Sequence, residues 1–414
     1  MSKTFGKPGR RLAVALFAFL LPVSVSAHDF GLHLNQLARF GGVGNDSGVD
    51  KYYAGIVPRF SAQVGDYGDL FLSAGFRTIY EGGWTFVPEL LRNEFSRSFG
   101  DVDFRVGRMT HADPMRLVAA GLFDGVRFSR HTGTGTFGAG VWYTGLLYKN
   151  RALISMTDCD AASRREAFDW NRFGETYFAS RRLMAALDWE HPSFAELMRL
   201  NVALIAQADL NSRNRDFRYH SQYIVATASV PFQRFVFEFG GALETSQSVS
   251  GGTVFNVALA GDVGLHWMPP APFHNMLSFT GRFTSGRADG GPMSAFVPLT
   301  ALPHGDVLRA EIPGLSILRL NYTARLYRTF SAGFSVSHFV RSDLGTFDAF
   351  PLTAGETSDG FSLGTEFFAR FVWNPVSDIG MNFGAGVFLP ALGNAAPDAG
   401  PRWRVDLTVV FALY

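Results

Sequence analysis

Arginines alternate with apolar residues in two neighbouring stretches of the sequence, 102–108 and 121–129. Arg105 is flanked by phenylalanine and valine, and Arg127 by valine and phenylalanine. Successive side chains of an extended chain point to opposite faces, so each stretch predicts a strand with one apolar and one arginine-bearing face. Burying an unpaired arginine in a dry core costs several kcal/mol. We therefore expect water on the arginine face, where fixed positive charges attract anions.

The same alternation continues along the chain and assigns a set of charged residues to the wet face. The expected pore-lining residues are Arg77, Arg105, Arg127, Arg182, Arg199, Arg282, Arg319, Arg325, Glu366 and Arg370. Arg218 and Arg404 share this face with Asp188, Asp209, Glu238, Glu244, Asp262 and Asp406. Eleven arginines then face seven carboxylates, and such an excess lowers the electrostatic barrier for anions. The alternative is that these charges neutralise one another across neighbouring strands and keep the wall hydrated.

Arg108 and Asp124 lie instead on the apolar faces of the two opening stretches, near their ends. We expect a cross-strand ion pair at the rim of a membrane, with a ligand contact as the alternative. The loop between them contains His111, Asp113 and Arg116. These residues either fold inward as a constriction or form part of an ordinary surface loop.

The sequence lacks the residue patterns typical of enzymes and metal sites. It has no zinc-ligand spacing, no nucleophile elbow, no phosphate loop and no calcium loop. The single thiol, Cys159, has no partner for an internal disulfide. The net charge of +1 gives no bulk attraction to nucleic acid. We therefore expect no catalysis, cofactor, metal ion or nucleic-acid partner.

Residues 1–27 have the pattern of a cleaved signal peptide. A basic start with two lysines and two arginines precedes the apolar run Leu12–Leu21, and Val25-Ser26-Ala27 fits a cleavage site. After Ala27 no apolar run reaches the ~18 to 20 residues that a membrane-spanning helix needs. The expected mature chain, 28–414, is therefore an outer-membrane barrel or a secreted β-protein.

Eighteen stretches have strand-like alternation, and 45 glycines and 41 phenylalanines fit many turns and aromatic positions. The stretches are 30–40, 52–64, 70–79, 84–98, 102–108, 121–129, 136–148, 176–189, 196–208, 218–230, 234–244, 255–267, 277–283, 315–327, 331–340, 361–373, 379–389 and 403–414. Every second connection is only a few residues long, whereas 149–172, 285–313, 341–360 and 390–401 are long. This parity predicts an all-β transmembrane antiparallel barrel of eighteen strands, with sixteen as the alternative. The first strand leaves no room for an N-terminal plug domain.

A thirty-residue region is similar to one known family. Val106-Gly107-Arg108, then Arg116-Leu117-Val118, then Phe123-Asp124-Gly125-Val126-Arg127-Phe128 resembles the alginate-export family of outer-membrane proteins. The resemblance implies an eighteen-stranded monomeric barrel whose arginine-lined pore passes an anionic polysaccharide or small solutes. It also implies that Arg127 faces the lumen.

These patterns favour a passive outer-membrane channel for small, hydrophilic, anionic solutes, or for export of an anionic polysaccharide. Its other partners would be the outer-membrane lipid and the barrel-assembly machinery. The alternative is a non-conducting adhesin or structural barrel that binds a partner through 149–172, 285–313 and 341–360. An outer-membrane hydrolase is a third, lesser hypothesis.

Overall fold

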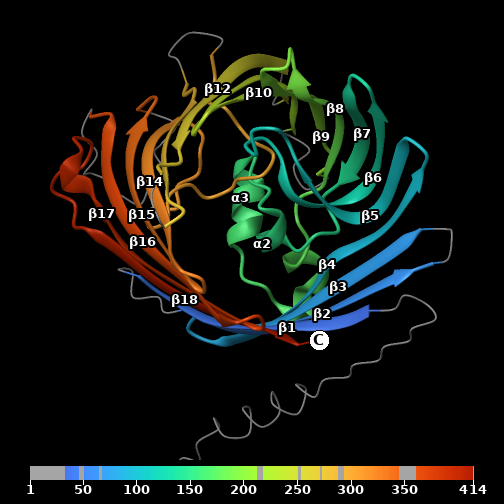
Figure 1. Cartoon of the computed structure of the whole chain (residues 1–414), viewed down its shortest axis with the longest axis horizontal. Coiled ribbons are helices and arrows are strands. Elements are labelled where there is room, and N and C mark those ends of the chain that lie inside the picture. Colours follow the sequence, from blue (N-terminus) through green and yellow to red (C-terminus); the bar gives the residue numbers. More distant parts are fainter. Residues whose placement is uncertain are drawn as a thin grey trace, which may run out of the picture.

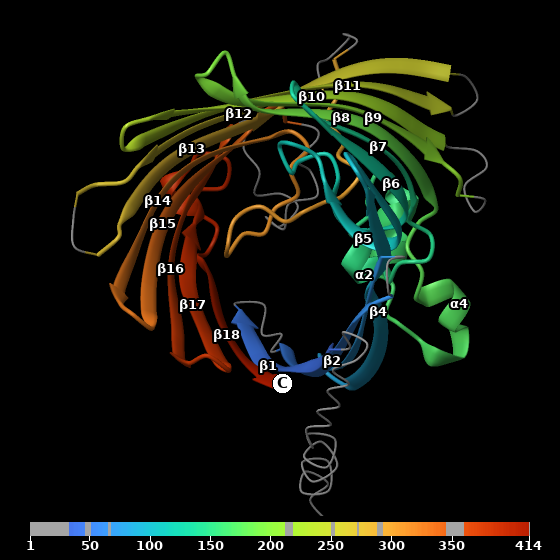
Figure 2. The same ribbon diagram turned by 45° about the vertical axis from the view of Figure 1, so that its right-hand side comes forward.

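The structure is a computed structural model that describes residues 33–45, 51–64, 68–211, 218–249, 253–270, 273–287, 293–344 and 360–413. The expected signal peptide lies outside these residues. One antiparallel sheet of eighteen strands closes into a ring, because β1 pairs with both β2 and β18. Figures 1 and 2 show this ring from two directions. The predicted eighteen-stranded barrel is therefore confirmed.

The strands follow one another around the ring in the order of the sequence. They are β1 (His33–Asn45), β2 (Lys51–Gln63), β3 (Asp69–Tyr80), β4 (Trp84–Phe99), β5 (Val102–Ala112), β6 (Ala120–Thr132), β7 (Gly135–Tyr143), β8 (Arg182–Phe194), β9 (Met198–Asp209), β10 (Arg218–Phe232), β11 (Phe235–Val249), β12 (Thr253–Trp267), β13 (Met276–Thr284), β14 (Leu315–Tyr327), β15 (Phe330–Arg341), β16 (Ser362–Val376), β17 (Ile379–Leu389) and β18 (Arg402–Leu413).

Alternation along each strand separates an outer face from an inner one. In β12, Phe255 is 68% exposed and Val263 is 50% exposed, whereas Ala258 and Ala260 on the other parity are 0% and 7% exposed. Small and polar residues therefore face the interior while large apolar residues face outward. Among the described residues, no helix is both long and apolar enough to cross a bilayer.

The connections at one end of the barrel are short, and those at the other end, here the long-loop end, include three long segments. The segment between β7 and β8 carries α2 (Lys149–Ala152), α3 (Asp158–Arg165), η2 (Trp170–Arg172) and α4 (Phe173–Thr176). The other long segments lie between β13 and β14 and between β15 and β16, and η3 (Pro390–Leu392) precedes β18. The predicted contrast between short and long connections is thus present.

The boundaries of β7 and β8 differ from the expectation. The seventh strand was expected to reach residue 148 and the eighth to begin at 176, but β7 ends at Tyr143 and β8 begins at Arg182. Thr144 N–H donates to the Arg182 carbonyl at 3.1 Å, and beyond this rung the chain folds into helices. The Thr176 hydroxyl hydrogen-bonds the carbonyls of Asp169 and Arg172 at 3.0 Å, so it serves a helical turn rather than a strand.

An apolar core lies inside the ring rather than between two sheets. Buried wall residues such as Trp142 and Phe339 pack with Phe296 and Leu299 from the segment between β13 and β14. Figure 1 shows α2, α3 and this segment within the ring. The described residues contain no separate plug domain, and the inward-folded segments partly fill the lumen.

Candidate channel lumen

The tip of the β5–β6 hairpin leaves the wall at a pair of glycines. Gly107 pairs with Gly125 across the two strands, and Gly107 has a φ of +116°. A Cβ at Gly107 would lie 2.2 Å from the Asn93 carbonyl, and one at Gly125 would lie 2.1 Å from the Val141 carbonyl. Both positions therefore require glycine, and the end of β5 lies inside the ring in Figure 1.

Arg108 and Asp124 are directly beyond this bend, in register with each other. Arg108 donates from Nε and Nη2 to the two carboxylate oxygens of Asp124 at 2.7 and 2.8 Å. Its Nη1 and Nη2 also donate to the carbonyls of Leu90 at 2.6 Å and Leu146 at 3.0 Å. Arg108 is only 5% exposed. Arg108 and Asp124, which were expected to pair at a rim, thus form a buried ion pair. Through Arg108 this pair connects β4, β5, β6 and the segment after β7.

A single carboxylate shapes the loop at the tip of the hairpin. Asp113 accepts the backbone N–H groups of Met115, Leu117, Val118 and Ala119 at 2.9 to 3.1 Å. Burial raises the pKa of Asp113, while these hydrogen bonds act in the opposite direction. Of the residues expected in this loop, His111 belongs to β5 and stacks on Trp142 with 4.2 Å between ring centroids. The loop does fold inward, as one of the two alternatives predicted.

Three inward segments are joined to one another in the lumen. The Thr300 N–H donates to the Val118 carbonyl at 3.1 Å, and the Ala120 N–H donates to the Thr300 hydroxyl at 2.9 Å. The Ala301 N–H donates to the Leu153 carbonyl at 2.8 Å. The hairpin tip, the α2 region and the segment before β14 therefore form one constriction.

Carboxylates from the wall hold the same segment from the other side. Glu366 accepts the N–H groups of Asp306, Val307 and Leu308 at 2.7 to 2.8 Å, and it is 0% exposed. Glu244, also 0% exposed, accepts the Val297 N–H at 2.7 Å. Glu366 was expected to line the pore. The Glu366 side chain points inward, but residues 306–308 cover it completely, because their backbone N–H groups require an acceptor.

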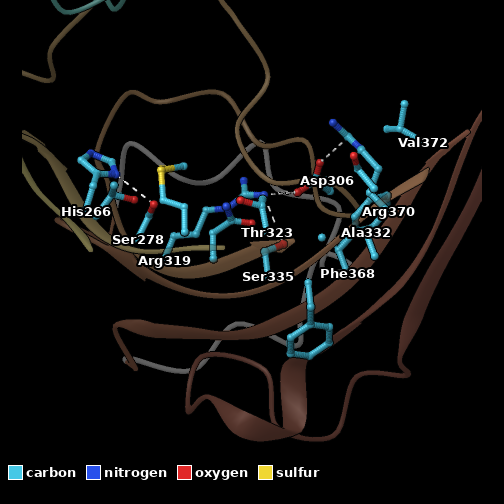
Figure 3. Close-up of a pocket in the computed structure, with 16 residues that line it drawn as sticks. His266, Ser278, Asp306, Arg319, Thr323, Ala332, Ser335, Phe368, Arg370 and Val372 are labelled. Atoms are coloured by element: carbon cyan, nitrogen blue, oxygen red, sulfur yellow. Dashed lines mark hydrogen bonds and ion pairs between the residues drawn. The ribbon is translucent and has the colours of Figure 1, made fainter. Parts of the chain in front are cut away.

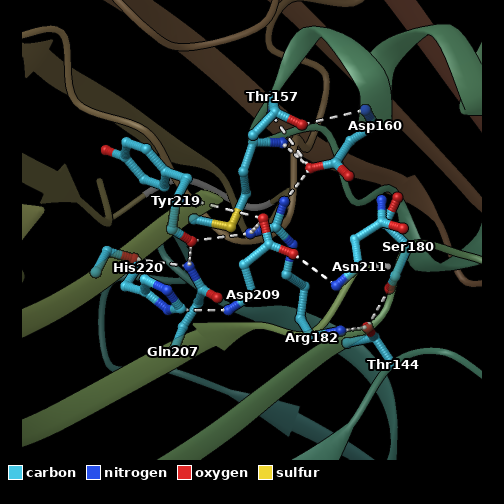
Figure 4. Close-up of polar contacts among 12 residues, drawn as sticks. Thr144, Thr157, Asp160, Ser180, Arg182, Gln207, Asp209, Asn211, Tyr219 and His220 are labelled. Atoms are coloured by element: carbon cyan, nitrogen blue, oxygen red, sulfur yellow. Dashed lines mark hydrogen bonds and ion pairs between the residues drawn. The ribbon is translucent and has the colours of Figure 1, made fainter. Parts of the chain in front are cut away.

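Arg182 is the second correction to the expected pore lining. Its side chain is 0% exposed and forms ion pairs with Asp160 of α3 at 2.5 Å and Asp209 of β9 at 3.1 Å. Its Nη1 donates to the Tyr219 carbonyl at 3.0 Å. Figure 4 shows Arg182 between these carboxylates. It therefore anchors α3 to the wall and has no contact with channel water.

A lumenal cavity of about 880 Å³ lies along β1 to β4. Arg39, Arg59, Arg77 and Arg92 line it from the wall, and Arg151 of α2 lines it from the inside. Glu89 binds two of these arginines, since Arg77 Nη2 lies 2.6 Å and Arg151 Nη2 lies 2.8 Å from its carboxylate. Thr110 and Leu122 of the hairpin tip also line this cavity.

A second cavity of about 460 Å³ lies along β12 to β16. Arg319 and Arg370 line it and share one carboxylate, that of Asp306, at 2.6 and 3.0 Å. Figure 3 shows Asp306 between the two guanidiniums, with Ser335 and Thr323 nearby. The side chains of Arg319 and Arg370 are 34% and 56% exposed, so solute has access to both.

The other expected lumenal arginines take several environments. Arg127 pairs with Asp188 at 2.7 Å, and Arg282 pairs with Asp262 at 2.5 Å. Arg105 is half-buried opposite Arg127 in the ladder. The remaining two, Arg199 and Arg325, are exposed close to the short turns. The structure therefore brings Arg319 and Arg370 together in the second cavity, whereas Arg77 lies with Glu89 and Arg151 in the cavity along β1 to β4.

Several lumenal residues were not among the predicted ones. Arg39 and Arg59 lie on strands whose alternation is weak, and Arg92 lies in a bulge of β4 opposite β3. Arg151 and Asp306 belong to connections, for which alternation gives no inward or outward assignment. Both connections were expected only as long outer loops, so no pattern in the sequence pointed to these last two residues.

Comparisons of the sequence with protein-family profiles and with curated proteins give no match. Comparison with solved structures gives clear matches to barrels of Pseudomonas aeruginosa. OccK5 (OpdH) is similar with a TM-score of 0.61 and 11% identity, over 92% of this chain and 98% of that chain. The outer membrane protein OprD has a TM-score of 0.59 and 11% identity, over 92% and 94%.

OccK2 (OpdF) in complex with glucuronate is similar with a TM-score of 0.58 and 10% identity, over 92% of this chain and 96% of that chain. At such low identity the likeness establishes the fold alone: this chain has the barrel architecture of these proteins. Solute and mechanism are inferred separately, from the residues of this chain.

Proposed function

We propose that this protein is an outer-membrane channel through which small hydrophilic anions diffuse passively. The observation that carries the proposal is a closed ring with an apolar outer face and arginine-lined cavities inside. The proposal includes a signal peptide at 1–27, removed on export, and insertion of 28–414 by the barrel-assembly machinery. It involves no catalytic step.

The outer face has the character of a lipid-facing surface. Leu187, Leu204, Ile224, Phe279 and Leu318 come from five strands and are each 45–58% exposed. A soluble protein would leave these large apolar side chains in water, which is unfavourable at about 25 cal/mol per Å² of apolar area. A bilayer removes that cost, and pairing around the ring satisfies most backbone groups of the strands within the sheet.

The charge of the lumen favours anions. Glu89 and Asp306 each bind two arginines, so in each of these groups of three side chains one positive charge is not matched by the shared carboxylate. Arg39 and Arg59 form no ion pair within the described part of the chain, and they line the larger cavity. Such an excess lowers the barrier for anions and raises it for cations.

The joined inward segments favour a small solute. One similar barrel, OccK2, was solved with glucuronate, a small sugar carboxylate. Export of an anionic polysaccharide, which the resemblance of residues 106–128 to the alginate-export family implies, is a finer alternative within the same proposal. It requires a path that a polymer can thread past the constriction.

The adhesin alternative has less support from the structure. Much of 149–172 and 285–313 folds into the lumen, as buried Ile154, Asp160, Phe296 and Leu299 show. These residues hold the constriction and are not available to an external partner. Most of 341–360 lies outside the described residues.

Planar-bilayer recording of the purified protein tests the proposal. We expect discrete conductance steps, and a reversal potential in a salt gradient that corresponds to anion preference. A folded protein that never conducts would refute the channel and leave the adhesin alternative. Conduction with cation preference would refute the assigned role of the arginines.

A further inference from the structure

Part of the barrel wall lacks a strand-to-strand ladder. β4 pairs with β5 only from Phe99 to Asn93, although β4 begins at Trp84 and its first residues pair with β3. Above the glycine bend β5 has turned into the lumen. The stretch 84–92 of β4 therefore has an open edge on that side, which we call the seam.

The segment after β7 closes the seam. Lys149 N–H donates to the Tyr177 carbonyl and Ala179 N–H to the Leu147 carbonyl, both at 2.9 Å, and Tyr148 and Phe178 form an antiparallel bridge. This short ribbon occupies the place of the missing strands. The ribbon buries Tyr148 and Tyr177, which pack with Val87 of β4.

Side chains rather than a backbone ladder attach the ribbon to β4. The carbonyls of Phe86, Pro88 and Leu90 accept hydrogen bonds from Trp170 Nε1 at 3.2 Å, Tyr177 Oη at 2.7 Å and Arg108 Nη1 at 2.6 Å, respectively. The three acceptors are alternate residues of β4, so their carbonyl groups all point to the open edge of the strand. Pro88, which has no N–H, is tolerated on such an edge.

The two sides of the seam have different chemistry. On the lumenal side, Glu89 and Arg151 line the large cavity together with Arg77 and Arg92. On the outer side, Trp170 stacks on Phe86 with centroids 6.3 Å apart, and Phe86 stacks on Phe76 at 6.4 Å. Figure 2 shows α4 outside the ring, next to β4. The segment therefore passes from the lumen to the apolar outer face.

We infer that the seam is a lateral binding site for an anionic amphiphile, whose charged head lies among the lumenal arginines and whose alkyl tail lies among the aromatic residues of the seam. This inference rests on the proposed function in one respect only, namely that the outer face of the barrel contacts lipid. A tail entering from the outer leaflet displaces ring contacts and three side-chain hydrogen bonds, whereas entry between two strands that are paired along their length requires breaking a backbone ladder. Each methylene removed from water contributes about 0.8 kcal/mol, so occupancy should rise about fourfold per methylene.

The probe is an alkyl sulfate with a photoreactive diazirine near the end of its chain, added below its micelle concentration to the full protein in lipid vesicles. We expect labelling on residues 146–149 and 173–179, more strongly for a ten-carbon than for a six-carbon chain. A maltoside with the same tail carries no charge and should label the site several-fold less. Labelling spread evenly over the outer face, or independent of head charge, would overturn the inference.

Paired variants test the side-chain attachment. Trp170→Phe with Tyr177→Phe removes two donors to β4 and keeps an aromatic ring at each position, and it should increase labelling of the seam several-fold. Trp189→Phe is the matched control, because its Nε1 donates to the Thr134 carbonyl at 3.1 Å where the ladder is intact. Equal labelling in both variants would overturn the inference. Conductance is recorded in parallel, so that loss of current with retained seam labelling would refute the channel and leave the lateral site.

Discussion

The guanidinium of Arg182 lies 2.5 Å from the carboxylate of Asp160, and both side chains are completely buried. Breaking a buried pair by removing one partner leaves an uncompensated charge and costs about 3–5 kcal/mol. We therefore expect Arg182→Met to lower the free energy of unfolding by about that amount in urea titrations of the protein in lipid vesicles.

Arg199→Met is the control for this variant. Arg199 pairs with Glu190 at 3.2 Å, but its side chain is 59% exposed, and exposed pairs contribute about 0–1 kcal/mol. Similar losses in the two variants would show that Arg182 does not anchor α3 as described.

Replacing Arg39 and Arg59 by glutamine should shift selectivity towards cations. A unit charge about 4 Å away contributes roughly 1 kcal/mol in water, so removing each arginine should lower anion permeability about fivefold and the anion-to-cation permeability ratio by at least that factor. Reversal potentials in a salt gradient measure the ratio. Arg325→Gln, at the short-turn end, should change it little; an equal effect there would mean that the β1–β4 cavity is not the ion path.

Asp306→Asn should have the opposite effect. The carboxylate of Asp306 neutralises part of the charge of Arg319 and Arg370, so its removal should raise anion preference about fivefold by the same electrostatic argument. Glu190→Gln is a control, because Glu190 is an exposed acid that pairs with Arg199 near a short turn and does not line this cavity. An unchanged reversal potential in D306N would place the ion path away from the second cavity.

Acid should loosen the segment before β14. Burial and the neighbouring Arg282 lower the pKa of His304 to about 4 from its ordinary 6.5. Between these values the unfolded chain binds the proton and the folded chain does not, so stability falls as the pH falls from about 6.5 to 4. Arg282 Nη1 and His304 Nε2 lie 2.9 Å apart, and a protonated imidazole has no acceptor for that guanidinium.

Current noise of the open channel should therefore rise as the pH falls from about 6.5 to 4. His304→Gln keeps an acceptor for Arg282 but does not titrate, so it should remove the pH dependence. His131→Gln, on β6 beside an exposed short turn, should leave the pH dependence of the noise unchanged. A noise increase that persists in H304Q would assign the effect to another group.

The alternation of residues predicted the strands well because a wall with an apolar outer face and a polar inner face imposes a period of two on most of its strands. Arg319 and Arg370 were placed on the inner face on that basis. Alternation does not say what covers an inward residue, so Arg182 and Glu366 were assigned to open water although loops bury them. The loops themselves are positioned by contacts between distant parts of the chain, such as Thr300 with Val118.

Residues 106–128, which resemble a known family, have structural roles that were not evident from the sequence. Gly107 and Gly125 permit the bend, and Arg108 and Asp124 close the wall behind it. The pattern therefore describes where a hairpin enters the lumen, whichever solute passes.

Glu366, on β16, fixes residues 306–308, although their connection joins β13 to β14. The connection therefore keeps this hold only while β16 is paired into the sheet beside β15. A barrel in which β16 had come away from β15 would lose this hold, and its interior would be wider than that of the intact ring.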